Sequence, residues 1–118
     1  MLSPSFSVAQ NSGNPSVLLF SDTSSGSDVS VTKRRIYLLQ ANGQYLVPSG
    51  VTTNYIDWAL ADTTKSLDVL TEDTALQITT QWLDSSNVVL YTVTTAFGFS
   101  AYGETFYYNL TQLQQANP

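Results

Sequence analysis

The stretch Ile36-Tyr-Leu-Leu-Gln-Ala-Asn-Gly-Gln-Tyr-Leu-Val47 decides the fold, because it predicts a tight β-hairpin. Two runs of apolar and aromatic residues flank the pair Asn42-Gly43. Asn-Gly is a strong hairpin signal, since both residues accept the positive φ angles of a two-residue type I′ turn. The chain is therefore expected to double back here, and Pro48-Ser49-Gly50 is expected to end the second arm.

Upstream of the hairpin, residues 29–40 are predicted to form one long strand. Their apolar side chains change parity along the chain, and a β-bulge near residues 33–35 would bring them all to one face of the sheet. The side chains concerned are Val29, Val31, Ile36 and Leu38.

Downstream of the hairpin, residues 75–83 alternate between apolar and polar side chains, which is typical of a half-buried strand. Residues 84–87 are then predicted as a hairpin loop and residues 88–95 as the return strand. Further short strand patterns at regular spacing, with no amphipathic helix, predict an antiparallel β-sandwich of about seven to nine strands. Its predicted core consists of Leu19, Ile36, Leu38, Trp58, Leu76, Ile78, Trp82, Leu90, Phe106 and Tyr108.

The predicted fold class is all-β, an immunoglobulin-like antiparallel sandwich. The segment Thr71-Glu-Asp-Thr-Ala75 resembles the turn that precedes a late strand in immunoglobulin domains. The Tyr and Cys that follow this turn in that family are replaced by Gln77 and Thr79. This resemblance therefore supports only a turn that enters a strand.

The composition predicts one domain over residues 1–118, with residues 1–15 as an arm or edge strand and 112–118 as a polar tail. The chain of 118 residues contains no His and no Cys, and only 11% of its residues are charged. The commonest general base, the thiol nucleophile and the favoured ligands of transition metals are all missing. A non-enzymatic protein is therefore expected.

The charge balance limits the class of partner. The net charge of −5 argues against a nucleic-acid binder, which needs a basic surface, and against binding to anionic membranes. No apolar run approaches the ~20 residues that span a bilayer. The N-terminal residues lack the basic and apolar regions of a secretory signal, so synthesis in a cytoplasm is expected.

Two acidic loops are candidate calcium sites, because calcium prefers oxygen ligands such as carboxylates. The first contains Asp68, Glu72 and Asp73, and the second contains Asp22, Ser24 and Asp28. The alternative is that these residues solvate and cap turns. Neither loop carries a recognisable metal motif, so no metal and no other cofactor is predicted.

The candidate partner-binding residues are Lys33, Arg34, Arg35 and Tyr107. The basic run holds three of the four Lys and Arg residues, and strand geometry puts Lys33 and Arg35 on the face opposite to Arg34. It either anchors an acidic partner or forms a solvated edge that prevents unwanted strand pairing. Tyr107 either points outward to a sugar or a protein surface, or belongs to ordinary sandwich packing.

Several segments together resemble a family of small virion proteins of tailed bacteriophages, especially crAss-like phages. The segments are Ser21–Asp28, Arg34–Leu38, Tyr45–Gly50, Tyr55–Trp58, Asp68–Leu76 and Phe106–Gln112. The resemblance covers most of the chain, and its motifs are structural rather than catalytic. It implies a β-sandwich that serves as an auxiliary or decoration subunit of the phage head, and it supplies no active-site residues.

The expected function is therefore that of a structural virion protein, bound to a phage capsid or other virion proteins and assembled in the bacterial cytoplasm. Two alternatives stay open: a carbohydrate-binding module on the virion surface, with weak glycan contact, and a component of the neck or tail. An exposed pair of aromatic rings would favour sugar binding, whereas a large apolar patch with an ordered N-terminal arm would favour a capsid partner.

Overall fold

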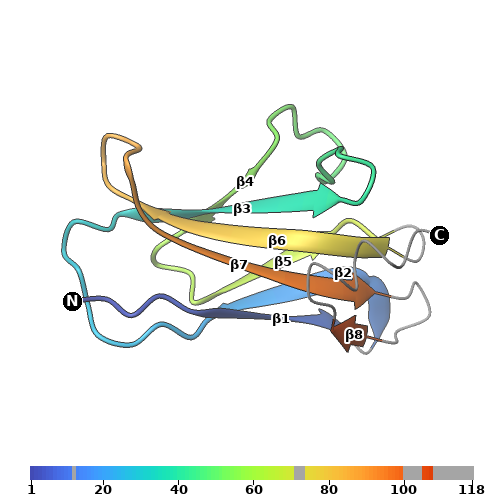
Figure 1. The fold of residues 1–118 in the computed structure, drawn as a ribbon, viewed down its shortest axis with the longest axis horizontal. Coiled ribbons are helices and arrows are strands. Elements are labelled where there is room, and N and C mark those ends of the chain that lie inside the picture. Colours follow the sequence, from blue (N-terminus) through green and yellow to red (C-terminus); the bar gives the residue numbers. More distant parts are fainter. Residues whose placement is uncertain (12, 71–73, 100–104, 108–118) are drawn as a thin grey trace.

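The computed structural model describes residues 1–11, 13–70, 74–99 and 105–107. The described residues form only β-strands, turns and loops (Figure 1). The strands are β1 (Phe6–Asn11), β2 (Asn14–Asp22), β3 (Lys33–Gln40), β4 (Ile56–Ala59), β5 (Thr64–Asp68), β6 (Thr74–Leu83), β7 (Val89–Phe99) and β8 (Thr105–Tyr107).

The strands make two antiparallel sheets that pack as layers of a sandwich (Figure 1). One sheet has the order β1-β2-β5, and the other has the order β4-β3-β6-β7-β8. The chain crosses between the sheets after β2, after β4 and after β5. The predicted all-β sandwich is confirmed.

The core lies between the two inner faces and follows the alternation of the strands. Trp58, Leu76 and Ile78 are fully buried, as are Ile36 and Leu38, and Trp82 is 1% exposed. All these positions were predicted from period-two patterning, because successive side chains of a strand point to opposite faces. The clean strand over residues 75–83 is β6, and its hairpin to β7 also forms as predicted.

Two of the predicted core residues are wrong, and two fall outside the described side chains. Leu19 is 39% exposed because Leu18 and Phe20 take the inner positions of β2. Leu90 is 36% exposed, on the outer side of the β7 start. The backbone of Phe106 belongs to β8 but its side chain is not described, and Tyr108 lies outside the described residues.

The predicted strand over residues 29–40 is also wrong in its first part. β3 begins only at Lys33, and its register with both neighbours runs without a bulge. Val29 is 97% exposed on the preceding loop, while Val31 is buried from that loop. Arg34 lies on the same inner face of β3 as Ile36 and Leu38. A charged residue therefore occupies the inward position for which the sequence predicted an apolar side chain brought in by a bulge.

The hairpin after β3 forms, but not with the predicted type I′ turn. Gly43 N donates to Gln40 O at 3.0 Å, and Gln40 N donates to Gln44 O at 2.9 Å. Gly43 has a φ of 87°, whereas Asn42 does not have a positive φ. A three-residue loop with one left-handed glycine therefore closes the hairpin. The second arm pairs with β3 through the single bridge between Leu39 and Tyr45.

Replacing Gly43 with Val is expected to destabilise the domain by about 1–2 kcal/mol, because a β-branched residue resists the left-handed region. A Cβ at this position would meet no atom within 4 Å, so the cost comes from the backbone alone. Gly43→Asn is the matched control, since Asn tolerates positive φ better. Urea unfolding measures both variants, and an equal loss for Val and Asn would contradict the assigned backbone conformation.

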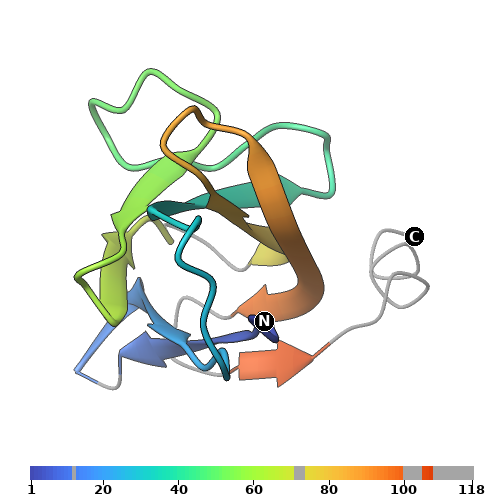
Figure 2. The ribbon, with the colours of Figure 1, turned by 90° about the vertical axis from the view of Figure 1, so that its left-hand side faces the viewer.

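One end of the sandwich gathers the N-terminal residues and three connections (Figure 2). The register places them there: Phe6 pairs with Asp22, Ser21 with Thr64, and Lys33 with both Ala59 and Leu83. We call this surface the loop end. It comprises residues 1–5, 23–32, 60–63 and 84–88.

Candidate functional site

The structure separates the three basic residues of the run 33–35. Lys33 and Arg35 lie on the outer face of the five-stranded sheet and are partly exposed, whereas Arg34 points inward and is 2% exposed. The predicted alternation of faces is thus confirmed. The expectation that Arg34 contacts a partner is wrong, because its guanidinium is enclosed by this chain's own residues. The run is not a sheet edge either, since β3 lies between β4 and β6.

The Arg34 guanidinium joins two connections of the loop end. Its Nη1 donates to the carbonyl of Asp62 and its Nη2 to the carbonyl of Leu60, each at 2.9 Å. Its Nε lies 3.1 Å from Asp22 Oδ2, a contact that is an ion pair rather than an aligned hydrogen bond. The guanidinium carbon also lies 4.2 Å from the ring centroid of Trp58.

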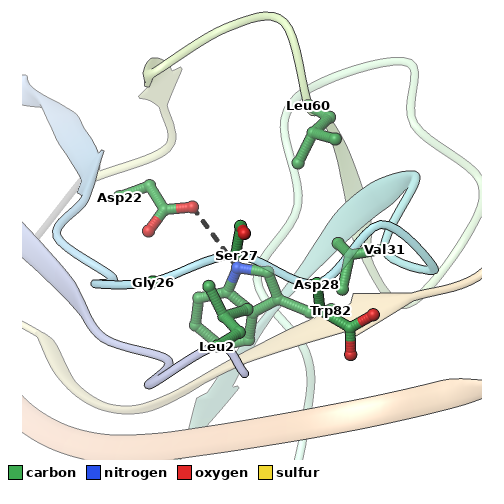
Figure 3. Close-up of a pocket in the computed structure, with 8 residues that line it drawn as sticks. All are labelled: Leu2, Asp22, Gly26, Ser27, Asp28, Val31, Leu60 and Trp82. Atoms are coloured by element: carbon green, nitrogen blue, oxygen red, sulfur yellow. Dashed lines mark hydrogen bonds between the residues drawn. The ribbon is translucent and has the colours of Figure 1, made fainter.

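Both tryptophans of the chain donate hydrogen bonds to acceptors that Arg34 also contacts. Trp58 Nε1 donates to the carbonyl of Asp62 at 2.7 Å, and Trp82 Nε1 donates to Asp22 Oδ2 at 3.3 Å (Figure 3). Burial lowers the pKa of Arg34, and the charge of Asp22 and then that of Asp62 oppose this shift. Arginine remains charged in proteins, so the cluster holds a desolvated cation against a largely buried carboxylate.

Short aspartate contacts brace the other connections of the loop end. Asp22 Oδ1 accepts from Ser24 N at 2.8 Å, and Asp28 Oδ1 accepts from Ser30 N at 2.9 Å. Asp84 Oδ1 accepts from the backbone N–H groups of residues 86 and 88 in the β6–β7 hairpin. Such contacts between an aspartate and the backbone two residues on are typical of turns. Each loop therefore has its conformation fixed from within.

Asp28 also connects its loop to β7. Tyr91 Oη donates to Asp28 Oδ2 at 2.7 Å. This hydrogen bond, together with that from Ser30 N, lowers the pKa of Asp28. The same bond raises the pKa of Tyr91, because the phenol loses a favourable contact when it ionises beside a carboxylate.

The oxygens of the second candidate calcium loop are engaged in these contacts. Asp22 and Asp28 bind backbone and side-chain donors, and Ser24 Oγ donates to the carbonyl of Ser5 at 3.2 Å. Within the described ranges, no three His, Cys, Asp or Glu residues are grouped as metal ligands would be. Of the first loop, Glu72 and Asp73 lie outside the described residues.

A pocket of about 190 Å³ opens at the loop end (Figure 3). Its walls are largely apolar and come from Leu2, Val31, Leu60 and Trp82, with Asp22 and Asp28 beside them. The N-terminal residues close one side, since Ser3 and Ser25 exchange backbone hydrogen bonds. Gly26 permits this approach, because a Cβ there would collide with the carbonyl of Met1.

Exposed apolar side chains occur on the loops of this end and at the adjoining start of β7. Val29 is 97% exposed, and Val88 is 53% exposed at the tip of the β6–β7 hairpin. The other exposed apolar side chains at or beside this end are Met1, Leu60, Val89 and Leu90. Patterning did not predict this arrangement, because it depends on which loops the sandwich brings to one end.

A second surface lies on the outer face of the five-stranded sheet, where aromatic rings follow β3. Arg35 Nε donates to Asp57 Oδ1 at 3.2 Å, and its guanidinium carbon lies 4.2 Å from the Tyr55 ring centroid. The Tyr37 ring then lies between Tyr55 and Tyr45, with centroid distances of 5.6 Å and 5.9 Å. We call Tyr55, Tyr37 and Tyr45 the tyrosine row.

Beside the tyrosine row runs a groove of about 230 Å³. It is lined by Tyr37, Leu39 and Tyr45 on one side and by Gln77, Thr79 and Gln81 of β6 on the other. Sequence patterning did not predict a site at these residues. The parity of β3 does contain the signal, since Arg35, Tyr37 and Leu39 fall on the face opposite to the core row.

Tyr107, the remaining candidate contact, is the last residue of β8, and its side chain lies outside the described part. Lys33 stays partly exposed at the start of β3, on the outer face. The structure therefore brings Lys33 and Arg35 to one face, removes Arg34 from the surface, and gives no side-chain position for Tyr107.

No helix long and apolar enough to cross a membrane occurs among the described residues. Comparisons of the chain with protein-family models, with curated proteins and with solved structures return no match.

Proposed function

We propose that this protein is a non-enzymatic structural subunit of a tailed-phage virion, held on the capsid through protein–protein contacts at its loop end. The single observation that carries the proposal is that the loop end holds both a largely apolar pocket and exposed valine and leucine side chains. Exposed apolar groups gathered with a pocket are typical of protein interaction sites. The resemblance to small virion proteins supplies the class of partner.

The bracing of the loops supports this role. Arg34 fixes residues 60 and 62, and Asp22, Asp28 and Asp84 each fix the turn that follows them. A surface that is ordered before binding loses less conformational entropy on association, which favours affinity. Asp28 and Asp62 beside the apolar side chains favour a partner surface with an apolar centre and basic residues around it.

The proposal includes an immunoglobulin-like topology. In support, the order β1-β2-β5 against β4-β3-β6-β7-β8 resembles the immunoglobulin order A-B-E against C′-C-F-G, with β8 as an additional strand beside β7. In variable domains, the B–C and F–G loops of one end bind antigen. The corresponding connections here are β2–β3 and β6–β7, and both belong to the loop end.

The test is incorporation of a Val29→Asp/Val88→Asp double variant into purified phage particles. Both side chains are highly exposed on loops, so the variant is expected to fold normally. Two carboxylates in a desolvated apolar contact should reduce occupancy at least about tenfold, equivalent to roughly 1.4 kcal/mol. Occupancy is measured by quantitative mass spectrometry of particles.

Leu19→Asp is the matched control. Leu19 is 39% exposed on the outer face of the three-stranded sheet, so this variant places a carboxylate on the surface away from the loop end. Wild-type occupancy is expected for the control. Equal occupancy of the double variant and the wild type would remove the loop end from the capsid contact, and absence of the wild-type chain from particles would overturn the structural role itself.

A further inference from the structure

We propose that the groove beside the tyrosine row is a binding site for neutral carbohydrate, with room for a short stretch of a glycan chain. This site goes beyond the structural role, and it lies on the outer face of the five-stranded sheet rather than at the loop end. Three properties of the groove favour carbohydrate: its aromatic wall, its amide side chains and its lack of charged lining residues.

The aromatic wall is held in a fixed orientation. Arg35 covers the Tyr55 ring, and Tyr55 in turn supports Tyr37 at a centroid distance of 5.6 Å. Tyr37 and Tyr45 are inclined by 64° to one another, so the two rings flank the groove instead of stacking face to face. Tyr45 is 40% exposed. A pyranose ring presents C–H groups of slight positive charge, which are attracted to the negative face of an aromatic ring.

The opposite wall supplies hydrogen-bonding groups at strand spacing. Gln77, Thr79 and Gln81 alternate along β6 and stand opposite Leu39, Tyr37 and Arg35 in the register. Thr79 Oγ1 shares a hydrogen bond of 2.9 Å with Thr94 Oγ1. Among the described residues, no hydrogen bond engages the side-chain amide of Gln77 or of Gln81. Each amide offers two donor hydrogens and one acceptor oxygen, which matches the mixed donors and acceptors of sugar hydroxyl groups.

The charge of the groove selects the ligand class. No Asp, Glu, Lys or Arg side chain lines the groove, and the adjacent Arg35 is paired with Asp57. Nucleic acids and phosphorylated ligands need basic groups, and no basic residue lines the groove. The volume of about 230 Å³ lies below the roughly 300–1,000 Å³ of sites that enclose drug-sized ligands. A shallow, uncharged site with aromatic and amide walls fits one or two sugar units of a longer chain.

The shallow geometry sets the expected affinity. An open groove removes little of the ligand from water, so single-site binding at millimolar concentration is expected. Many copies on one particle would raise the avidity for a glycan-covered surface without any new contact. Weak binding by one subunit is therefore compatible with a useful role on an assembled particle.

The experiment is an NMR titration of the isotope-labelled full chain with maltohexaose, cellohexaose and chitohexaose as neutral probes. Shift changes from at least one probe are expected at residues 37, 45, 77 and 81. Tyr45→Ala should weaken that binding about tenfold, the factor expected for loss of one stacking ring. Tyr45 forms only an isolated bridge, so the variant is expected to fold.

Gln77→Ala is the second variant, because it tests the amide wall without changing the rings. Leu19→Ala on the other sheet is the control, and its affinity should equal that of the wild type. Shift changes confined to the loop end, or no shift changes with any probe, would overturn the proposal. Loss of particle incorporation by Tyr45→Ala without sugar binding by the wild type would assign the groove to a protein contact instead.

Discussion

Replacing Arg34 with methionine is expected to lower the free energy of unfolding by about 3–5 kcal/mol, the cost of removing one member of a buried ion pair. Methionine retains much of the apolar stem but leaves Asp22 without its cation. It also removes the guanidinium donor of the Leu60 carbonyl, and it leaves the Asp62 carbonyl with the Trp58 indole as its side-chain donor. The loss is measured by urea unfolding, with the tryptophan emission of Trp58 as the probe because that ring contacts the guanidinium.

Arg35→Met is the matched control on the next residue of the same strand. Arg35 also pairs with an aspartate and also stacks on an aromatic ring, but its partner Asp57 has a side chain that is 63% exposed. An exposed pair contributes about 0–1 kcal/mol, and added salt screens it further. The Arg34→Met loss should change little with salt. Similar losses for the two variants would show that the Arg34 guanidinium is not desolvated.

Arg34 also links stability to the proposed binding surface. Its guanidinium binds the Leu60 and Asp62 carbonyls and pairs with Asp22, so it connects residues 60–62 to β3 and to the end of β2. Arg34→Lys cannot reproduce this, because a single ammonium lacks the planar set of donors that reaches two carbonyls and a carboxylate together. The loop end is thus held by the same buried cluster that stabilises the sandwich.

The sequence predicted those strands in which apolar and polar residues alternate without interruption. In β6, Leu76, Ile78 and Trp82 face inward and Gln77 and Thr79 face outward, as the period of two requires. The pattern was less informative where apolar residues are consecutive. Val17, Leu18, Leu19 and Phe20 are all apolar, so either parity gives a plausible core face, and only the packing of the second sheet selects Leu18 and Phe20.

The candidate site was harder to predict, because the residues that form it are far apart in the sequence. Arg34 occupies a core position because its partners come from Asp22 and from two backbone carbonyls near residue 60, and carbonyls leave no mark in the sequence. The predicted bulge near residues 33–35 is not needed, because β3 begins at Lys33 and Arg34 itself takes the inward position next to Ile36. The tyrosine row could be partly foreseen from the parity of β3, whereas Tyr45 joins it only through the loop at Gly43.

Ile78→Ala and Leu19→Ala are expected to differ widely in stability, although patterning assigns both side chains to the same core. Ile78 is fully buried in the main core cluster, so Ile78→Ala should cost about 2–5 kcal/mol through lost burial and the cavity left behind. Leu19 is 39% exposed, and Leu19→Ala should change the free energy of unfolding by less than about 0.5 kcal/mol. Urea unfolding with an unchanged m-value measures both losses on one scale. A large loss of stability for Leu19→Ala together with a small loss for Ile78→Ala would show that the inner and outer faces of β2 and β6 are assigned the wrong way round. The core and the groove beside the tyrosine row would then lie on the opposite sides of the sheet.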